Sequence, residues 1–405
     1  MAATLIEGGV TAAVGFKASG IHCGIRKNKM KKDLALIVSE TLCDTASVYT
    51  QNKVKGSPIL VTKEHSQNGK AQAIIVNSGN ANTCNADGVE KANRMCRAIA
   101  PVLGIDETDV LVASTGVIGQ PLPIEPIEAH AEELAAALSE TGSAEANEAI
   151  LTTDTKLKEA AAEFLLDGRT CHIGGIAKGS GMIHPNMATM LGFITSDVNI
   201  DYTLLQKALS DCITDTFNMV SVDGDTSTND MVTVLANGMA GNERIVTEDA
   251  GYAAFREALM LVCMKLSRMI AKDGEGASKL LECVVTGIDT TVARKIAKSV
   301  ITSSLTKCAF YGADANWGRI LCAIGYCDED FDISKTEVSL ESAKGSILVC
   351  ENGAGVAFSE EKAKEILLED EIIIRIDMHD GEGTATAYGC DLTHEYVTIN
   401  GDYRT

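Results

Sequence analysis

Short apolar runs alternate with long helical stretches along the chain, and this alternation limits the fold more than any other property of the sequence. Residues 33–39, 73–77 and 110–113 are apolar runs of four to seven residues that end at polar or glycine residues, as buried strands do. Helical stretches follow at about residues 202–217 and 247–272. Because the strands and helices alternate without a strict β-α-β repeat, we expect a mixed α+β fold of the α/β kind, a layered sandwich with mixed sheets.

The remaining elements are predicted in the same way. Apolar residues at helical spacing in residues 124–138 predict a helix on the surface. Residues 178–188 contain glycines and a proline and show no periodicity, so they are predicted to form a loop. Further strands are expected near residues 163–166, 171–177, 191–195, 231–235, 281–286, 346–349 and 371–377, and a further helix over residues 291–302.

Length and charge limit the partners of the protein. A chain of 405 residues exceeds one ordinary domain, so we expect two large lobes, or one large layered body with a smaller unit. The net charge of -21 repels phosphate backbones, so nucleic acid is not an expected partner. The N-terminal residues lack the pattern of a secretory signal, and Lys265 and Arg268 interrupt the most apolar helical stretch. We therefore expect no membrane segment and a cytoplasmic protein.

Several familiar site patterns are absent from the sequence. The 13 cysteines include no C-x-x-C pair and the seven histidines no H-E-x-x-H, so no metal is expected. A phosphate-binding P-loop has the pattern G-x-x-x-x-G-K-[ST], with the lysine after its second glycine. In residues 174–180 (GGIAKGS), Lys178 precedes Gly179, which excludes a P-loop. Residues 223–230 (DGDTSTND) lack the glycine and glutamate of a calcium loop, and the sequence leaves open whether they line a site. His184, beside a proline, is interpreted as structural.

The segment around Thr189 is where the sequence suggests covalent chemistry. A Gly/Pro loop ends at Ala188, and Thr189 leads into the strand predicted at residues 191–195. In such an arrangement the Thr189 hydroxyl attacks the Ala188 carbonyl, and hydrolysis of the ester leaves Thr189 as a new chain terminus. Its α-amino group, with a pKa of about 7.7–8.0, can then act as the base for the hydroxyl of the same residue. The pattern alone also fits a threonine that merely packs in a strand.

Segments spread along the whole chain match the motifs of one enzyme family. They are residues 9–24 (GVTAAVGFKASGIHCG), 52–55 (NKVK), 73–82 (AIIVNSGNAN), 114–119 (STGVIG), 152–155 (TTDT), 175–191 (GIAKGSGMIHPNMATML), 312–320 (GADANWGRI), 389–396 (GCDLTHEY) and 400–405 (NGDYRT). In these segments the chain resembles the ornithine acetyltransferase family of arginine biosynthesis. Its members are glutamate N-acetyltransferases, and some are also amino-acid N-acetyltransferases. The resemblance implies a self-cleaving fold of the N-terminal-nucleophile type.

The resemblance also implies a cut and a reaction. The chain would cut itself between Ala188 and Thr189, giving an α chain of residues 1–188 and a β chain of residues 189–405 that assemble as α2β2. Thr189 would take the acetyl group from N2-acetyl-L-ornithine, release L-ornithine and pass the acetyl group to L-glutamate, which gives N-acetyl-L-glutamate. This two-step exchange predicts ping-pong kinetics. No cofactor is implied, and the sequence leaves open whether acetyl-CoA also serves as a substrate.

The resemblance assigns roles to individual residues. An oxyanion hole falls on the Thr115 hydroxyl and the Gly116 N–H. The substrate-binding positions fall on Thr152, Lys178, Thr189, Glu275, Asn400 and Thr405. Lys178 suits a substrate carboxylate, and Glu275 suits an ammonium group or a proton relay. Without the resemblance, Glu275 would be interpreted as a solvated loop residue and the C-terminal residues as frayed; with it, the C-terminal tail is expected to be ordered.

Two other functions fit parts of the same pattern. One is an N-terminal-nucleophile aminopeptidase or amidohydrolase, in which water replaces glutamate as the acceptor. The other is a metabolite-binding protein of the same fold without catalysis. The motifs that supply the nucleophile, the oxyanion pair and the C-terminal tail together favour the transferase.

Overall fold

The strands form two mixed sheets, one in each of two units of the chain. The computed structural model describes residues 3–184 and 190–402. The first unit comprises Met1–Gly179, Pro185–Phe217 and Thr226–Leu266, and the second comprises Ser180–His184, Asn218–Asp225 and Ser267–Thr405. The expected layered fold with mixed sheets is confirmed. Because the chain passes between the units several times, neither unit coincides with residues 1–188 or 189–405.

The sheet of the first unit has nine strands in the order β1-β6-β7-β8-β10-β3-β4-β5, and β2 also pairs with β3. The strands are β1 (Thr4–Ile6), β2 (Phe16–Ile21), β3 (Leu34–Tyr49), β4 (Lys70–Asn80), β5 (Val110–Val117), β6 (Lys158–Leu166), β7 (Arg169–Lys178), β8 (Leu191–Ser196) and β10 (Met231–Ala236). The sheet is mixed because β8 runs parallel to β10 and antiparallel to β7.

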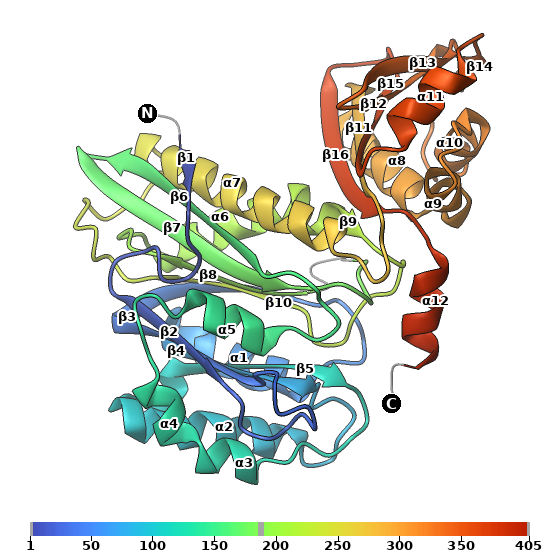
Figure 1. Cartoon of the computed structure of the whole chain (residues 1–405). Helices are drawn as coiled ribbons and strands as arrows, with labels where there is room; N and C mark the ends of the chain where they lie inside the picture. The colour runs from blue at the N-terminus through green and yellow to red at the C-terminus, as the bar shows by residue number, and fades with distance from the viewer. Residues whose placement is uncertain (1–2, 185–189, 403–405) are drawn as a thin grey trace. The chain divides into compact units, whose positions relative to one another are not determined.

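The long strand β3 belongs to both layers of this sheet. Its first residues pair with β2 and β4, and its last residues pair with β10. A register shift between Val38 and Cys43 interrupts the pairing with β4. Figure 1 shows β2, β4 and β5 in one layer, and β6, β7, β8 and β10 in the other. One apolar core includes buried residues of both layers, among them Ile37, Ile74 and Phe193.

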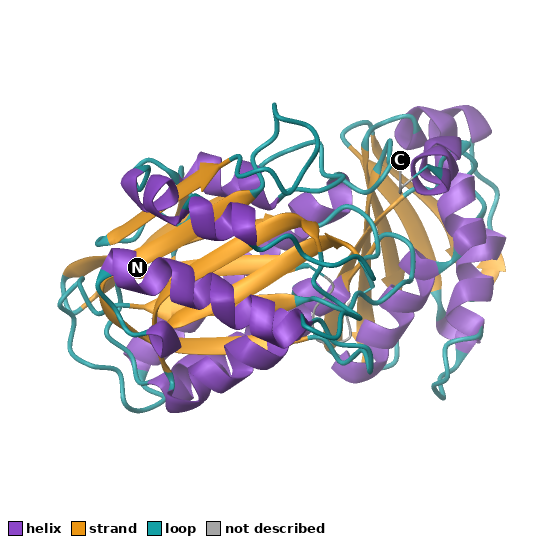
Figure 2. Ribbon diagram, turned by 90° about the horizontal axis from the view of Figure 1, so that it is seen from below, coloured by secondary structure: helices purple, strands orange, loops and turns teal. Residues whose placement is uncertain are grey.

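Helices cover the outer faces of the two layers, and the strands lie between them (Figures 1 and 2). They are α1 (Ser57–His65), α2 (Gly88–Leu103), α3 (Glu125–Ala129), α4 (Ala131–Ala136), α6 (Tyr202–Asp215) and α7 (Ala250–Lys272). Helix α5 (Ser143–Ile150) instead packs against strands of both layers and contributes Ala146, Ala149 and Ile150 to their shared core. Short 3-10 helices span Ser66–Asn68, Glu107–Asp109, Phe217–Met219 and Ile333–Lys335. No helix in the described part of the chain is both long and apolar enough to cross a bilayer.

The single helix predicted over residues 124–138 is wrong, because the chain forms two short helices, α3 and α4, that meet at His130. The His130 Nδ1 donates to the carbonyl of Pro126 at 2.7 Å. That carbonyl is the acceptor that the amide of residue 130 would use in a continuous helix. The His130 amide donates to the Ile127 carbonyl instead, and α3 ends there.

The second unit has a seven-stranded sheet in the order β14-β13-β12-β15-β11-β16-β9. Its strands are β9 (Val220–Ser221), β11 (Leu280–Ile288), β12 (Glu337–Ser342), β13 (Gly345–Glu351), β14 (Ala354–Gly355), β15 (Glu371–Asp377) and β16 (Gly383–Cys390). Its helices are α8 (Thr290–Thr302), α9 (Ser304–Tyr311), α10 (Trp317–Gly325), α11 (Glu360–Leu367) and α12 (His394–Gly401). Apolar residues of α8, α10 and α11 pack with the sheet in one core.

Candidate active site

Thr115 and Gly116 lie at the end of β5, where a bulge interrupts its pairing with β4. Gly79 pairs with Gly116, and Asn80 faces both Thr115 and Val117. Gly116 has a φ of 133°, and a Cβ there would lie 2.3 Å from the carbonyl carbon of Gly79, so no other residue fits without a shift of the backbone. A bulge re-aims the groups beside it. The geometry therefore suits the backbone donor that an oxyanion hole needs.

Asn229 holds this end of β5 against the loop that follows β4. Its Nδ2 donates to the carbonyls of Ala81 at 2.6 Å and Ser114 at 2.9 Å. The Thr83 hydroxyl donates to the Asn229 Oδ1 at 2.6 Å. Asn229 belongs to the polar loop of residues 223–230, and its contact with Ser114 places this part of the loop beside Thr115. No motif in the sequence marks Asn229 for this position.

A buried carboxylate, that of Asp154, brings the predicted positions Thr152 and Lys178 together. Its side chain is fully buried and accepts hydrogen bonds from the amides of Thr152 at 3.1 Å and Gly179 at 2.7 Å. The ammonium nitrogen of Lys158 lies 2.7 Å from one carboxylate oxygen, and that of Lys178 lies 3.8 Å from the other. Asp154 lies within a motif of the family resemblance, but no role was predicted for it.

The charges in this cluster favour an anionic ligand. Burial alone would raise the pKa of Asp154, but the ammonium groups of Lys178 and Lys158 and the Gly179 amide outweigh it and hold the pKa well below its usual value. Asp154 is therefore ionised at neutral pH. Two lysines around one carboxylate leave a local excess of positive charge on a protein whose net charge is -21. This suits the predicted role of Lys178 as a carboxylate ligand.

Ala188 and Thr189 lie outside the described residues, but the chain is anchored on both sides of them. On the N-terminal side, the amides of Met182 and Ile183 donate to the Asp223 carboxylate at 2.6 and 2.9 Å. On the C-terminal side, the Met231 amide donates to the Met190 carbonyl at 2.9 Å, where β8 and β10 begin. The described residues on each side of the predicted cut are therefore held by hydrogen bonds within their own unit.

His184 is part of the N-terminal anchor. Its Nδ1 lies 3.1 Å from the Ser221 hydroxyl. Burial, and to a smaller extent the charge of Lys298, lower the pKa of His184 to about 4, so the ring is neutral at physiological pH. A half-buried neutral histidine that bonds a serine fits the structural interpretation.

In the second unit, Glu275 and Asn400 are bonded to each other. The Asn400 Nδ2 donates to the Glu275 Oε2 at 2.7 Å, and the Glu275 amide donates to the Ser180 carbonyl at 2.9 Å. A Cβ on Gly181 would lie 2.2 Å from the Glu275 carboxylate, so this carboxylate packs directly on the glycine backbone. Glu275 is only 7% exposed, so its interpretation as a solvated loop residue is wrong. Thr405 lies outside the described residues.

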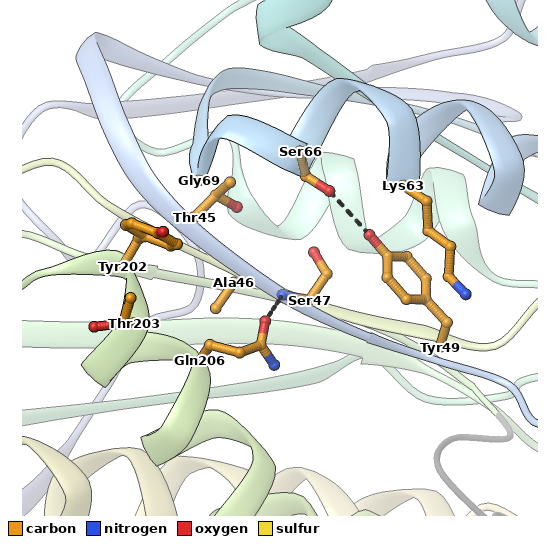
Figure 3. A pocket seen from close by; sticks show the side chains of 10 residues that line it. All are labelled: Thr45, Ala46, Ser47, Tyr49, Lys63, Ser66, Gly69, Tyr202, Thr203 and Gln206. Carbon is orange, nitrogen blue, oxygen red and sulfur yellow. Dashed lines mark hydrogen bonds between the residues drawn. The ribbon is translucent and has the colours of Figure 1, made fainter.

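A cavity of about 350 Å³ opens on the first unit over the last residues of β3 (Figure 3). The Lys63 Nζ lies 4.9 Å from the centre of the Tyr49 ring, and the Tyr49 hydroxyl bonds to that of Ser66 at 3.2 Å. Tyr202 and Gln206 of α6 line the opposite side of the cavity. None of the predicted site residues in the described part of the chain lines it, so we do not assign the active site to this cavity.

Comparisons with known proteins give one family. A sequence profile of the ArgJ family matches residues 17–405. The arginine biosynthesis bifunctional protein ArgJ of Caldanaerobacter subterraneus subsp. tengcongensis is 50% identical over 403 residues, which are 99% of this chain and 100% of that protein. The solved structure of the protein of the same name from Bacillus halodurans is 47% identical, with a TM-score of 0.50, and covers 53% of this chain and 99% of the solved chain. The solved structure of ornithine acetyltransferase with ornithine from Mycobacterium tuberculosis is 34% identical, with a TM-score of 0.43. It covers 46% of this chain and 100% of the solved chain.

Replacement of Asp154 by Asn should destabilise the first unit. The substitution leaves the two lysine ammonium groups without their shared carboxylate, so the free energy of unfolding should fall by about 3–5 kcal/mol in urea titrations at neutral pH. Because the pKa of Asp154 is depressed, its contribution is present above about pH 3.9 and is lost below it, so the two proteins should converge in acid. Glu128→Gln, which breaks a surface pair with Arg94, is the control. A loss no larger than that of the control would contradict the role of Asp154.

Proposed function

The chain belongs to the ArgJ family, and on that premise we propose how its residues carry out its reaction in arginine biosynthesis. It is a glutamate N-acetyltransferase, which moves the acetyl group of N2-acetyl-L-ornithine to L-glutamate and yields L-ornithine and N-acetyl-L-glutamate. The observation that carries this conclusion is the family match over residues 17–405. It also favours the transferase over an aminopeptidase or amidohydrolase of the same fold class.

The chain cuts itself between Ala188 and Thr189 in this proposal. The anchors at Asp223 and Met231, described above, support it because they hold the chain on both sides of the cut. The solved ArgJ chain from Bacillus halodurans agrees in size, since it covers 53% of this chain while 99% of it is matched. Residues 189–405 would make up about that share. The freed Thr189 then supplies both the nucleophilic hydroxyl and the α-amino group that takes the hydroxyl proton.

Thr115 and Gly116 stabilise the oxyanion that forms when Thr189 attacks the acetyl carbonyl. The bulge at the end of β5 supports this role, because it turns backbone groups out of the regular ladder. Asn229 adds to the support by fixing the Ser114 carbonyl, so the two donors need little rearrangement when charge develops.

Lys178 and Thr152 hold the part that both substrates share, their α-carboxylate. The local positive charge around Asp154 supports this assignment. In a two-step exchange, acetylornithine and glutamate use the same carboxylate ligand in turn. Glu275, which Asn400 bonds, is proposed to bind an ammonium group of the substrate, and Thr405 is proposed as a further substrate ligand.

The assembly and the second activity complete the proposal. The two chains are proposed to remain together as α2β2 in the cytoplasm and to need no cofactor. The relative from Caldanaerobacter subterraneus subsp. tengcongensis is called bifunctional, and this name supports a second reaction in which acetyl-CoA serves as the acetyl donor to glutamate. Both donors would load the same hydroxyl group of Thr189.

The self-cleavage predicts two fragments in active protein. Intact mass analysis of the wild type should give chains that start at Met1 and Thr189, while Thr189→Ala should remain one chain of 405 residues without transferase activity. Thr195→Val, within β8, is the control and should be cut normally. Active wild-type material that proves to be one unbroken chain would refute the mechanism.

The oxyanion role predicts a loss of turnover when the Thr115 hydroxyl is removed. Thr115→Val keeps the shape of the side chain, so cut enzyme should show a kcat about 10²–10³-fold lower and a KM for acetylornithine close to that of the wild type. Steady-state rates of cut material provide the measurement. Thr108→Val, before the opposite end of β5, should leave kcat unchanged. An equal kcat for Thr115→Val and wild type would remove Thr115 from the mechanism.

The second activity predicts that acetyl-CoA acetylates Thr189. Incubation of cut enzyme with acetyl-CoA alone should add one acetyl group to the β chain, and subsequent glutamate should remove it as N-acetylglutamate. Both steps should be absent from Thr189→Ala. Mass spectrometry of the β chain provides the measurement, and an enzyme that stays unmodified by acetyl-CoA but is acetylated by acetylornithine would show that only one donor is used.

A further inference from the structure

Helix α12 lacks the buried apolar face that holds most helices in a protein. None of its eight residues, His394–Gly401, is buried, and Val397 is 70% exposed. An isolated helix shorter than about 12–15 residues is marginal in water, so a short helix usually depends on packing. The few polar contacts that α12 makes must therefore carry much of this task. Their strength matters for the site because α12 carries Asn400.

The first turn of α12 lies on the loop that holds Glu275. The hydroxyl of Thr393, the residue before the helix, donates to the Gly276 carbonyl at 2.7 Å. Gly276 has a φ of 66°, and a Cβ there would lie 2.7 Å from the Tyr396 nitrogen, so the helix packs directly on the glycine backbone. One turn later, Asn400 donates to Glu275. Helix α12 thus lies along the segment of Glu275 and Gly276.

Asp223 joins α12 to a second segment of the same unit. The Tyr396 hydroxyl donates to the Asp223 Oδ2 at 3.3 Å. The same carboxylate accepts from the amides of Met182 and Ile183, at 2.6 and 2.9 Å. Burial, followed by the charge of Asp223 and its hydrogen bond, raises the pKa of Tyr396. The hydroxyl therefore keeps its proton and remains a donor at physiological pH.

The contacts of Asp223 complete a closed ring around Glu275. Gly181, which directly precedes the two residues whose amides bind Asp223, packs against the Glu275 carboxylate. That carboxylate accepts from Asn400, and Asn400 also donates to the Tyr396 carbonyl at 3.0 Å. Tyr396 leads back to Asp223 through its hydroxyl. Glu275 is thus held from two sides, and both sides meet at one carboxylate.

Met182 depends on the same carboxylate for its conformation. Its φ of 56° lies in the left-handed region, which residues with a side chain seldom adopt. Such a conformation persists only where the surrounding structure holds it. The bond from the Met182 amide to Asp223 supplies this hold. Loss of the carboxylate would therefore also release the turn on which Glu275 packs.

We propose that Asp223 is a positioning residue for substrate binding. Through Tyr396 it holds α12, and it thereby keeps Glu275 and Asn400 in place for the ammonium group of acetylornithine. That molecule has one ammonium group, on its side chain, because its α-amino group is acetylated. The inference rests on the role of Glu275 as an ammonium ligand in the proposed function.

The proposed role affects KM and kcat differently. When α12 loses a contact, Glu275 and Asn400 are in place for only a fraction of the time. The apparent dissociation constant rises in inverse proportion to that fraction, whereas saturating substrate selects the competent state. A merely structural role would instead lower the amount of active enzyme, and hence the apparent kcat, without a change in KM.

Tyr396→Phe tests the contact with the smallest change, since it removes only the hydroxyl. The KM of cut enzyme for acetylornithine should rise about 10-fold at saturating glutamate, with kcat within about two-fold of the wild type. Amide hydrogen exchange of residues 394–401 should become faster, because α12 opens more often. Tyr311→Phe is the matched control. It keeps the ring contact with His394, at 5.9 Å between centroids, and should change neither quantity.

Asp223→Asn tests whether Tyr396 acts through this carboxylate. The variant also loosens the turn at Met182, so its KM for acetylornithine should rise more than that of Tyr396→Phe. Adding Tyr396→Phe to Asp223→Asn should raise KM no further, because both changes break the same bond. Fully additive effects would overturn the connection through Tyr396. If Asp223→Asn does not fold, Tyr396→Phe with its control decides.

Glu275→Gln separates this inference from the function on which it rests. An unchanged KM for acetylornithine in Glu275→Gln would refute the proposed role of Glu275 itself. A raised KM in that variant, together with a wild-type KM and wild-type exchange of α12 in Tyr396→Phe, would overturn the role of Asp223 alone. A raised KM in both variants, with kcat retained in Tyr396→Phe, would support the inference.

Discussion

The buried carboxylate of Asp154 is the interaction on which the candidate site depends. Taking one carboxylate and two ammonium groups out of water is costly, and the cost is offset only when every charge finds close partners. The hairpin of β6 and β7 provides them, because its register places Lys158 opposite Ala177 and so brings Lys178 to the same end. Two backbone amides complete the set. A slip of one residue in this hairpin would turn the lysine of one strand to the other face of the sheet, away from the carboxylate.

A second constraint comes from the way β3 joins the two layers of the first unit. The strand pairs with β4 at its start and with β10 at its end, so the loops beside these strands are held by one continuous element. Asn229, from the loop before β10, can then bond to Ala81 and Ser114, which are more than a hundred positions away in the sequence. The bulge at Gly116 is thus held by both the sheet and a side chain.

Much of the sheet, but less of the helical cover, could be predicted from the sequence. The apolar runs at residues 73–77, 110–113 and 191–195 form parts of β4, β5 and β8, because a strand buried on both faces needs a continuous apolar sequence. No prediction was made for α1 or α2. The sequence of α1 has no amphipathic pattern and contains Pro58, while α2 begins with Gly88 and includes Pro101 near its end. Packing against the sheet outweighs the weak local signal of α1. In α2, by contrast, the apolar residues Ala92, Met95, Cys96 and Ile99 do recur at helical spacing.

The site could be predicted only where a motif preserves it. Lys178 and Glu275 were identified by family resemblance, whereas Asp154 and Asn229 were missed because an acid or amide in a polar segment gives no sign of burial. Their burial depends on strand register and on distant contacts, neither of which a short pattern records. The positive local charge around Asp154 could not be predicted from the composition either, since the net charge of the chain is -21 while two lysines surround this carboxylate.

Asp154 and Asp230 show why residue type alone does not decide a role in this site. Both carboxyl groups are buried, and both feel the charge of Lys178, which lowers the pKa of each. Asp154 has a second lysine and two amides, so it is ionised whatever happens at the chain cut. Asp230 has mainly hydroxyl partners, so burial raises its pKa well above the usual value. The same lysine therefore faces one carboxylate that stays ionised and one carboxyl group that resists ionisation, and the number of charged and amide partners decides between the two.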